Sequence, residues 1–165
     1  HTYLITTNLD EIFEGEGTKD MRYKKWQNNS SGEYRFSKYE KYDADNAAAN
    51  VSNYLVPLVR MSEVYYIAAE ANLENNAPEA YRLLNEVRVS RNLDPLPETL
   101  KNDRVALTKQ LIYEYQKDTW GEGKLFYFYK HLFHDIITRE GNIQATKALF
   151  ELPIPKDELE FGGNE

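Results

Sequence analysis

Val56-Pro-Leu-Val-Arg-Met-Ser-Glu-Val-Tyr-Tyr-Ile-Ala-Ala-Glu-Ala71 is the stretch of this 165-residue chain that most constrains its fold. Because proline is poorly tolerated inside a helix, Pro57 predicts an extended start. A helix is then expected from about Met61 or Ser62, with Ser62 as a candidate N-cap. Apolar residues recur on it at i, i+3, i+4 and i+7, which predicts one buried stripe. The members of that stripe are Val64, Ile67, Ala68 and Ala71.

A second amphipathic helix is predicted after a short Asn75-Asn76 link. Pro78 fits its first turn, where a missing N–H costs little. The two helices would then form a helical hairpin across residues 56–93. The apolar stripe of the second helix consists of Ala77, Ala80, Tyr81, Leu84 and Val87.

The spacing of small and large residues in this hairpin is typical of a tetratricopeptide repeat (TPR). Small side chains such as Ala68 and Ala80 allow two helix backbones to approach closely, and Leu84 then fills the space beside them. Asn92 stands near the position where the repeat usually closes with proline. The sequence therefore predicts one TPR-like unit, with a generic helical hairpin as the alternative.

The remaining segments are assigned from their turn and helix signals. Residues 1–55 are expected to be an irregular, aromatic-rich arm, with a short strand or extended segment over 34–42. Asp103 is predicted to cap a third helix, which has apolar positions on two faces and is therefore expected to be buried on both sides. Gly121 and Gly123 should break it.

An aromatic helix is predicted after that break, from Lys124 to about Ile137, so that helices occupy 103–138. Two prolines predict an extended tail over 150–165. The whole chain, 1–165, is expected to be a single all-α domain.

Four blocks of the sequence, in order, resemble the SusD/RagB family. Residues 56–71 are similar to the family signature "PLIRLSEVYLIAAEA", and Leu84-Asn-Glu-Val-Arg-Val-Ser-Arg-Asn-Leu93 is similar to "LNEVRARAGL". Glu114-Tyr-Gln-Lys-Asp-Thr-Trp-Gly-Glu-Gly-Lys124 resembles "ER..EL..EG.R", and Leu152-Pro-Ile-Pro155 resembles the closing "LPIP". Aromatic residues replace the usual W-F-D-L stretch at 126–129, which suggests that aromatic packing has replaced charge there.

The resemblance implies a portion of the SusD-like α/α superhelix. It implies a nutrient-binding lipoprotein of the Bacteroidetes outer membrane, taking part in polysaccharide utilization. Such a protein would bind an oligosaccharide or other nutrient at the cell surface and deliver it, uncleaved, to a SusC-like TonB-dependent transporter. Since the blocks are those of the C-terminal part of the family, this chain is expected to be the C-terminal portion of a longer protein. The lipid-bearing Cys would then lie upstream of it.

Composition disfavours several other classes. The net charge is −7, with 27 acidic against 20 basic residues, so no basic footprint for nucleic acid is expected. The chain has no cysteine, which excludes disulfides and thiol chemistry. Its apolar runs are too short to span a membrane.

Several groups of residues could carry chemistry. His131 and His134 have a spacing that could chelate zinc, but two helix-borne histidines without a third ligand are more often structural, so no metal and no cofactor are expected. Two sets of carboxylates could hydrolyse glycosidic bonds, although such sets are more often ion-paired or solvated. These sets are Glu11, Glu14 and Glu16, and Glu114, Asp118 and Glu122. No catalytic residue is assigned, and the protein is not expected to be an enzyme.

A structural ion-pair network is also predicted between the two hairpin helices. Its expected members are Arg60, Glu63, Glu70 and Arg88.

Aromatic residues make up 13% of the chain and could stack on sugar rings. Those in the helices are expected to be core, so only loop aromatics are retained as candidate ligand-binding residues: Trp26, Tyr34 and Tyr54. A TPR-type protein-interaction module remains an alternative function, which would show as an exposed apolar groove. A glycoside hydrolase is a further alternative and would need two carboxylates facing across one cleft.

Overall fold

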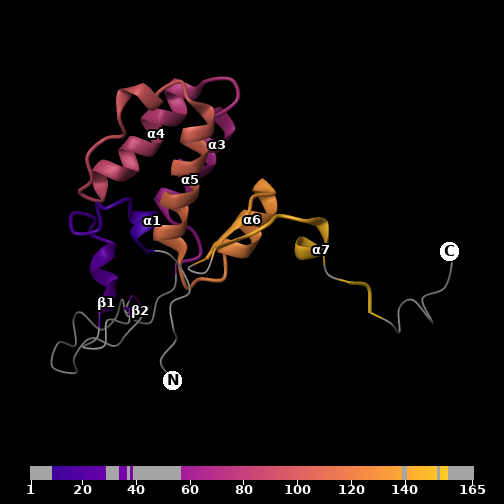
Figure 1. Cartoon of the computed structure of the whole chain (residues 1–165). Helices are drawn as coiled ribbons and strands as arrows, with labels where there is room; N and C mark the ends of the chain where they lie inside the picture. Colours follow the sequence, from indigo (N-terminus) through magenta and orange to yellow (C-terminus); the bar gives the residue numbers. More distant parts are fainter. Residues whose placement is uncertain are drawn as a thin grey trace.

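The computed structural model describes residues 9–28, 34–36, 38, 57–138, 141–151 and 153–155. Helices dominate these residues, which confirms the all-α prediction, and the strands form two short antiparallel pairs (Figure 1). The helices are α1 Leu9–Phe13, α3 Met61–Asn72, α4 Ala77–Ser90, α5 Arg104–Thr119, α6 Leu125–Leu132 and α7 Lys147–Phe150, with short 3-10 turns at Tyr23–Lys25 and Glu98–Leu100.

Helices α3 and α4 form the predicted hairpin. Helix α3 begins at Met61, as expected, but its N-cap residue is Arg60 and not Ser62. The Glu63 carboxylate accepts a hydrogen bond from the Arg60 backbone N–H at 3.3 Å, which satisfies one donor at the helix start. In α4, Pro78 lies in the first turn, and the predicted stripe faces the core.

The predicted stripe of α3 is wrong, because the opposite face of the helix is buried. Val64 and Ile67 are exposed, whereas Tyr66 and Ala69 lie in the core. Helix α5 packs against this second face of α3. The Asp118 carboxylate of α5 accepts a hydrogen bond from the Tyr66 hydroxyl at 2.7 Å, which fixes the orientation of α3 about its own axis.

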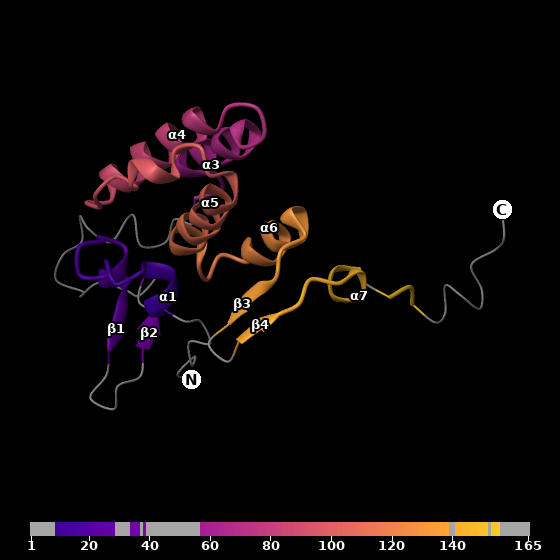
Figure 2. The ribbon, with the colours of Figure 1, turned by 45° about the horizontal axis from the view of Figure 1, so that its top comes forward.

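Helix α5 is the central element of the fold and contacts α1, α3 and α4 (Figure 2). Asp103 caps it as predicted, since its carboxylate accepts from the Ala106 N–H at 3.0 Å. From Gln110 to Thr119 every residue except Tyr115 is buried, which confirms burial on both sides. Tyr115 stacks on Phe128 of α6 with ring centroids 3.9 Å apart, in agreement with the expected aromatic packing.

The turn after α5 contains the two predicted glycines. Gly121 has φ +75°, and a Cβ there would lie 3.1 Å from the Phe36 ring, so both backbone conformation and space favour glycine. The helix predicted to reach about Ile137 is shorter than expected: α6 ends at Leu132, and Phe133 adopts a left-handed conformation.

A strand follows in place of the predicted helix end. β3 (Ile136–Thr138) pairs with β4 (Gly141–Ile143). Its three consecutive β-branched residues favour a strand over a helix. Beyond α7, residues 153–155 are not helical, as predicted for the tail. The single-domain assignment stays a prediction.

The N-terminal arm contains more structure than the sequence predicted. Helix α1 was not expected, and Ile12 and Phe13 within it are buried. β1 (Trp26–Asn28) pairs antiparallel with β2 (Tyr34–Phe36), which confirms a short strand at the start of the 34–42 segment.

Candidate functional site

Glu114 lies at the centre of a buried group of charges between α4, α5 and the N-terminal arm. Its carboxylate is fully buried and lies 2.7 Å from Arg22 Nη2, 3.0 Å from Arg88 Nη1 and 2.8 Å from Lys117 Nζ. Burial alone would raise the pKa of Glu114, but the charges of Arg22, Lys117 and Arg88 outweigh it and hold the pKa at about 2. The carboxylate is therefore ionised at neutral pH.

Asp118 lies one helical turn further along α5 and shares Arg22 with Glu114. Its Oδ1 lies 3.5 Å from Arg22 Nη1 and 3.4 Å from Arg91 Nε. Burial opposes ionisation of Asp118, yet these two guanidinium groups keep its pKa below the ordinary value. The pKa of Tyr66 is raised well above its ordinary value by burial and by the neighbouring carboxylates, so its hydroxyl remains a donor.

Glu122 gathers a further set of cations in the turn that follows α5. Its Oε1 lies 2.6 Å from Lys38 Nζ and also pairs with Arg60. Lys124 Nζ lies 2.8 Å from Glu63, which joins this turn to the start of α3.

We give one name, the α5 charge cluster, to the buried charged residues around Glu114 and Asp118. Its members are Asp20, Arg22, Arg88, Glu114, Lys117 and Asp118.

These contacts show how the carboxylates proposed for hydrolysis are used. Glu114 and Asp118 are held by arginines, and Glu122 lies beyond the end of the helix. In the N-terminal set, Glu11 accepts from the Tyr113 hydroxyl at 2.9 Å, and Glu16 pairs with Arg88 at 2.7 Å. Glu14 accepts from Gln110 Nε2 at 2.9 Å. These carboxylates are therefore held in ion pairs and hydrogen bonds within the protein, which is the interpretation that the sequence favoured.

The ion-pair network predicted within the hairpin is formed with different partners. Arg60 and Arg88 reach Glu122 and Glu114, and Glu63 reaches Lys124, so these pairs join the hairpin to α5 and the turn after it. Glu70 accepts from His131 Nε2 at 2.7 Å. The prediction was wrong about the partners because these charged side chains of α3 and α4 pair with other parts of the chain and not with each other.

The three loop aromatics proposed as ligand-binding residues have different outcomes. Trp26 is only 5% exposed and packs between Phe36 and Trp120, with ring centroids 4.7 and 5.3 Å away. Its indole Nε1 is buried and has no hydrogen-bond partner in the described part of the chain. The side chain of Tyr34 and all of Tyr54 lie outside the described residues.

Exposed aromatics occur instead on and just after α6. Tyr127 is 70% exposed, and the exposed rings of Phe126 and Phe133 both lie near the buried ring of Phe150. The sequence prediction missed these residues because it assigned helical aromatics to the core. The sequence could have indicated this exposure, because four of the eight residues of α6 are aromatic, more than one buried face of a short helix can hold.

The two histidines do not converge on one point. His131 contacts Glu70, whereas His134 Nδ1 lies 2.9 Å from its neighbour's carbonyl, Asp135 O. Across the described ranges, no group of three His, Cys, Asp or Glu residues could hold a metal ion. Within the same ranges, no helix is long and apolar enough to cross a membrane.

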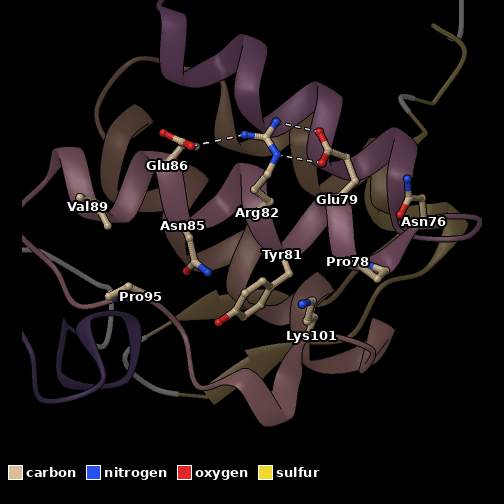
Figure 3. A pocket seen from close by; sticks show the side chains of 10 residues that line it. All are labelled: Asn76, Pro78, Glu79, Tyr81, Arg82, Asn85, Glu86, Val89, Pro95 and Lys101. Carbon is tan, nitrogen blue, oxygen red and sulfur yellow. Dashed lines mark hydrogen bonds and ion pairs between the residues drawn. The ribbon is translucent and has the colours of Figure 1, made fainter.

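An open groove of about 660 Å³ lies along the outer side of α4. Figure 3 shows Arg82 between Glu79 and Glu86 on one side of it, with Tyr81 and Lys101 on the other. Tyr81 OH donates to Leu96 O at 2.6 Å and fixes the loop that forms the far wall. The groove carries two residues of each charge and an aromatic ring, so it could hold a polar, uncharged ligand.

Comparison with known proteins identifies the class of this chain. The model of the family described as "SusD family" matches residues 6–129, which is most of the chain. No curated protein and no solved structure matches. The chain belongs to the SusD family, whose members are nutrient-binding proteins of the cell surface.

Proposed function

We propose that this protein binds an oligosaccharide at the outer surface of the outer membrane and passes it to a SusC-like TonB-dependent transporter, without cleaving it. The family match over residues 6–129 carries this proposal. A lipid anchor on a Cys upstream of this chain would hold it at the membrane. The ligand would be bound by ring stacking and hydrogen bonds at a rigid surface.

The state of the acidic residues supports binding without bond cleavage. A glycosidase needs one carboxylate free to donate a proton and a second free to act as base or nucleophile. Here Glu114 and Asp118 are buried against guanidinium groups, with their pKa values lowered, so both are poor proton donors at neutral pH.

The proposal is tested with a panel of plant and host polysaccharides, by affinity electrophoresis and calorimetry. This chain and the product of the entire reading frame are titrated side by side, and reducing ends are assayed in the same samples. Retardation without new reducing ends is the expected result. New reducing ends would favour the glycoside hydrolase alternative, and no binding by either protein would overturn the proposal.

The choice of variant matters for this experiment. A Trp26→Ala change would remove core packing whether or not Trp26 binds sugar, because its ring is buried. Tyr127→Ala removes an exposed ring and leaves the core intact, so it tests stacking directly.

One observation favours a TPR-type interaction module as a second function. Helix α3 and the residues just before it expose apolar side chains, among them Leu58, Met61 and Ile67. Contiguous exposed apolar surface is typical of protein contacts. Loss of transporter co-purification in an Ile67→Glu variant that still binds glycan would assign this face to a protein partner.

A further inference from the structure

A smaller pocket of about 240 Å³ lies between the N-terminal arm, α4 and the end of α5. Its wall differs sharply in charge from the chain as a whole, which has a net charge of −7. It contains a single carboxylate, Asp118, together with the apolar side chains of Met21 and Phe36. The cations in the wall are Arg22, Lys25, Lys38, Arg60, Arg91 and Lys117.

Asp118 lies in the wall and pairs with Arg22 and Arg91, whereas three further carboxylates that pair with wall cations, Asp20, Glu114 and Glu122, do not line the pocket. Asp20 and Glu114 are completely buried and approach Arg22 from the protein side. Glu122, likewise buried, holds Lys38 and Arg60. A ligand in the pocket would therefore face six cationic side chains and one carboxylate, and a concave wall with an excess of one charge attracts a ligand of the opposite charge.

Arg91 is the cation best placed to change partner. Its side chain is 31% exposed, and its guanidinium approaches Asp118 at 3.4 Å through Nε and 3.5 Å through Nη2, which is longer than the contacts of a well-formed charged pair. Its side chain borders a second hollow of about 340 Å³ between α3 and α4, which shares Arg60, Ser90 and Arg91 with the first.

The second hollow adds an aromatic ring to the same surface. Tyr65 and Met61 line it together with one acidic residue, Glu86, and Phe36 lines the first pocket, so apolar side chains lie on both sides of the basic wall. Sugar rings stack on such faces. The two adjoining hollows thus combine cationic side chains that could bind an anionic group with apolar side chains on which sugar rings could stack.

We propose that this pair of hollows binds an acidic saccharide, with the carboxylate or sulfate group of one sugar unit held against Arg91, Lys25 and Arg22. The proposal rests on the oligosaccharide function proposed above and narrows its ligand to anionic chains. Burial lowers the pKa of Lys38 despite its contact with Glu122, and a bound anion would favour the charged form of Lys38.

The test is calorimetric titration of this chain with trigalacturonate, a sulfated disaccharide, neutral galactotriose and inorganic sulfate. Arg91→Gln and Lys25→Gln remove one wall cation each. Arg104→Gln is the matched control, because Arg104 is exposed, pairs with Glu74 and lines neither hollow. Circular dichroism and the urea midpoint confirm that each variant is folded.

We expect an acidic saccharide to bind, with affinity falling as NaCl is raised. Loss of one charged hydrogen bond should weaken that binding about tenfold or more in Arg91→Gln, and binding should be unchanged in Arg104→Gln. Equal binding of neutral and acidic sugars, or an unaffected Arg91→Gln protein, would overturn this inference and leave the proposed function standing. Inorganic sulfate binding as tightly as the sugars would overturn the saccharide part, and binding of neither acidic sugar would overturn the inference whatever the neutral panel shows.

Discussion

The α5 charge cluster and the outer groove of α4 both place arginines between carboxylates, yet they are built in opposite ways. In the cluster, Arg22 and Glu114 come from segments 92 residues apart and are nearly or fully buried. In the groove, Arg82 pairs with Glu79 and Glu86 on its own helix, at i,i+3 and i,i+4, and the arginine side chain is 53% exposed.

The difference shows that the surroundings of a charge pair decide its energetic role. Water screens the groove pairs, so each contributes little to stability. The cluster is buried, so its members stabilise one another's charges in place of solvent, and removal of one leaves the others uncompensated. The cluster therefore links the N-terminal arm, the hairpin and α5, whereas the groove pairs connect residues of a single helix, α4.

The largest expected effect is that of Glu114→Gln. The change leaves Arg22, Arg88 and Lys117 buried around a neutral amide, and we expect the free energy of unfolding to fall by about 3–5 kcal/mol. Urea denaturation followed by circular dichroism measures it. Glu86→Gln on the exposed face of α4 is the matched control, and equal midpoints for the two variants would contradict the distinction between the two regions.

Acid should weaken the cluster in the same way. The pKa of Glu114 falls from an ordinary value of 4.5 to about 2 on folding, so the unfolded chain binds the proton more tightly. Its stabilisation is fully present above pH 4.5 and is lost as the pH falls toward 2, amounting to about 3 kcal/mol. Asp118 shifts in the same direction and adds to the loss.

Urea titrations of the two proteins between pH 7 and pH 2.5 test this expectation. The stability gap between the original protein and Glu114→Gln should narrow as the pH falls. A gap that stays constant would show that Glu114 does not carry the pH dependence.

The features that could be predicted from sequence are those determined by neighbours along the chain. Asp103 caps α5, and Gly121 lies in the turn that follows the end of this helix, because capping and positive φ depend on a few adjacent residues. The stripe of α4 around Ala80 and Leu84 was also predicted correctly, since periodicity is a local property.

The features that could not be predicted depend on partners distant in sequence. Spacing alone favoured Val64 and Ile67 as the buried side of α3, but Tyr66 is buried because α5 supplies acceptors for its hydroxyl some 50 residues later. Trp26 is enclosed by Trp120 for the same kind of reason. The burial of Glu114 was equally hidden, since an acidic residue on a helix is usually solvated.

A smaller effect is expected from Tyr81→Phe at the edge of the outer groove. The change removes the hydrogen bond from the Tyr81 hydroxyl to Leu96 O but keeps the ring, so we expect a loss of about 1 kcal/mol in the free energy of unfolding. The bond from Leu96 N–H to Asn85 Oδ1, at 2.8 Å, remains and should hold the loop in place. Hydrogen exchange at Leu96 should accelerate in Asn85→Ala more than in Tyr81→Phe, and the reverse order would mean that the hydroxyl is the main tie.

The smallest expected effect, Arg82→Gln, tests the other half of the comparison. Both pairs of Arg82 are exposed and lie on one helix, so water already solvates each charge well and ordering the long side chains offsets the attraction. We expect no measurable change in the urea midpoint, either at low ionic strength or in 1 M NaCl. A clear loss of stability at low salt that disappears in 1 M NaCl would show that the groove charges act as a coupled set. The groove would then resemble the cluster in its energetics, and burial alone could not explain the contrast between the two regions.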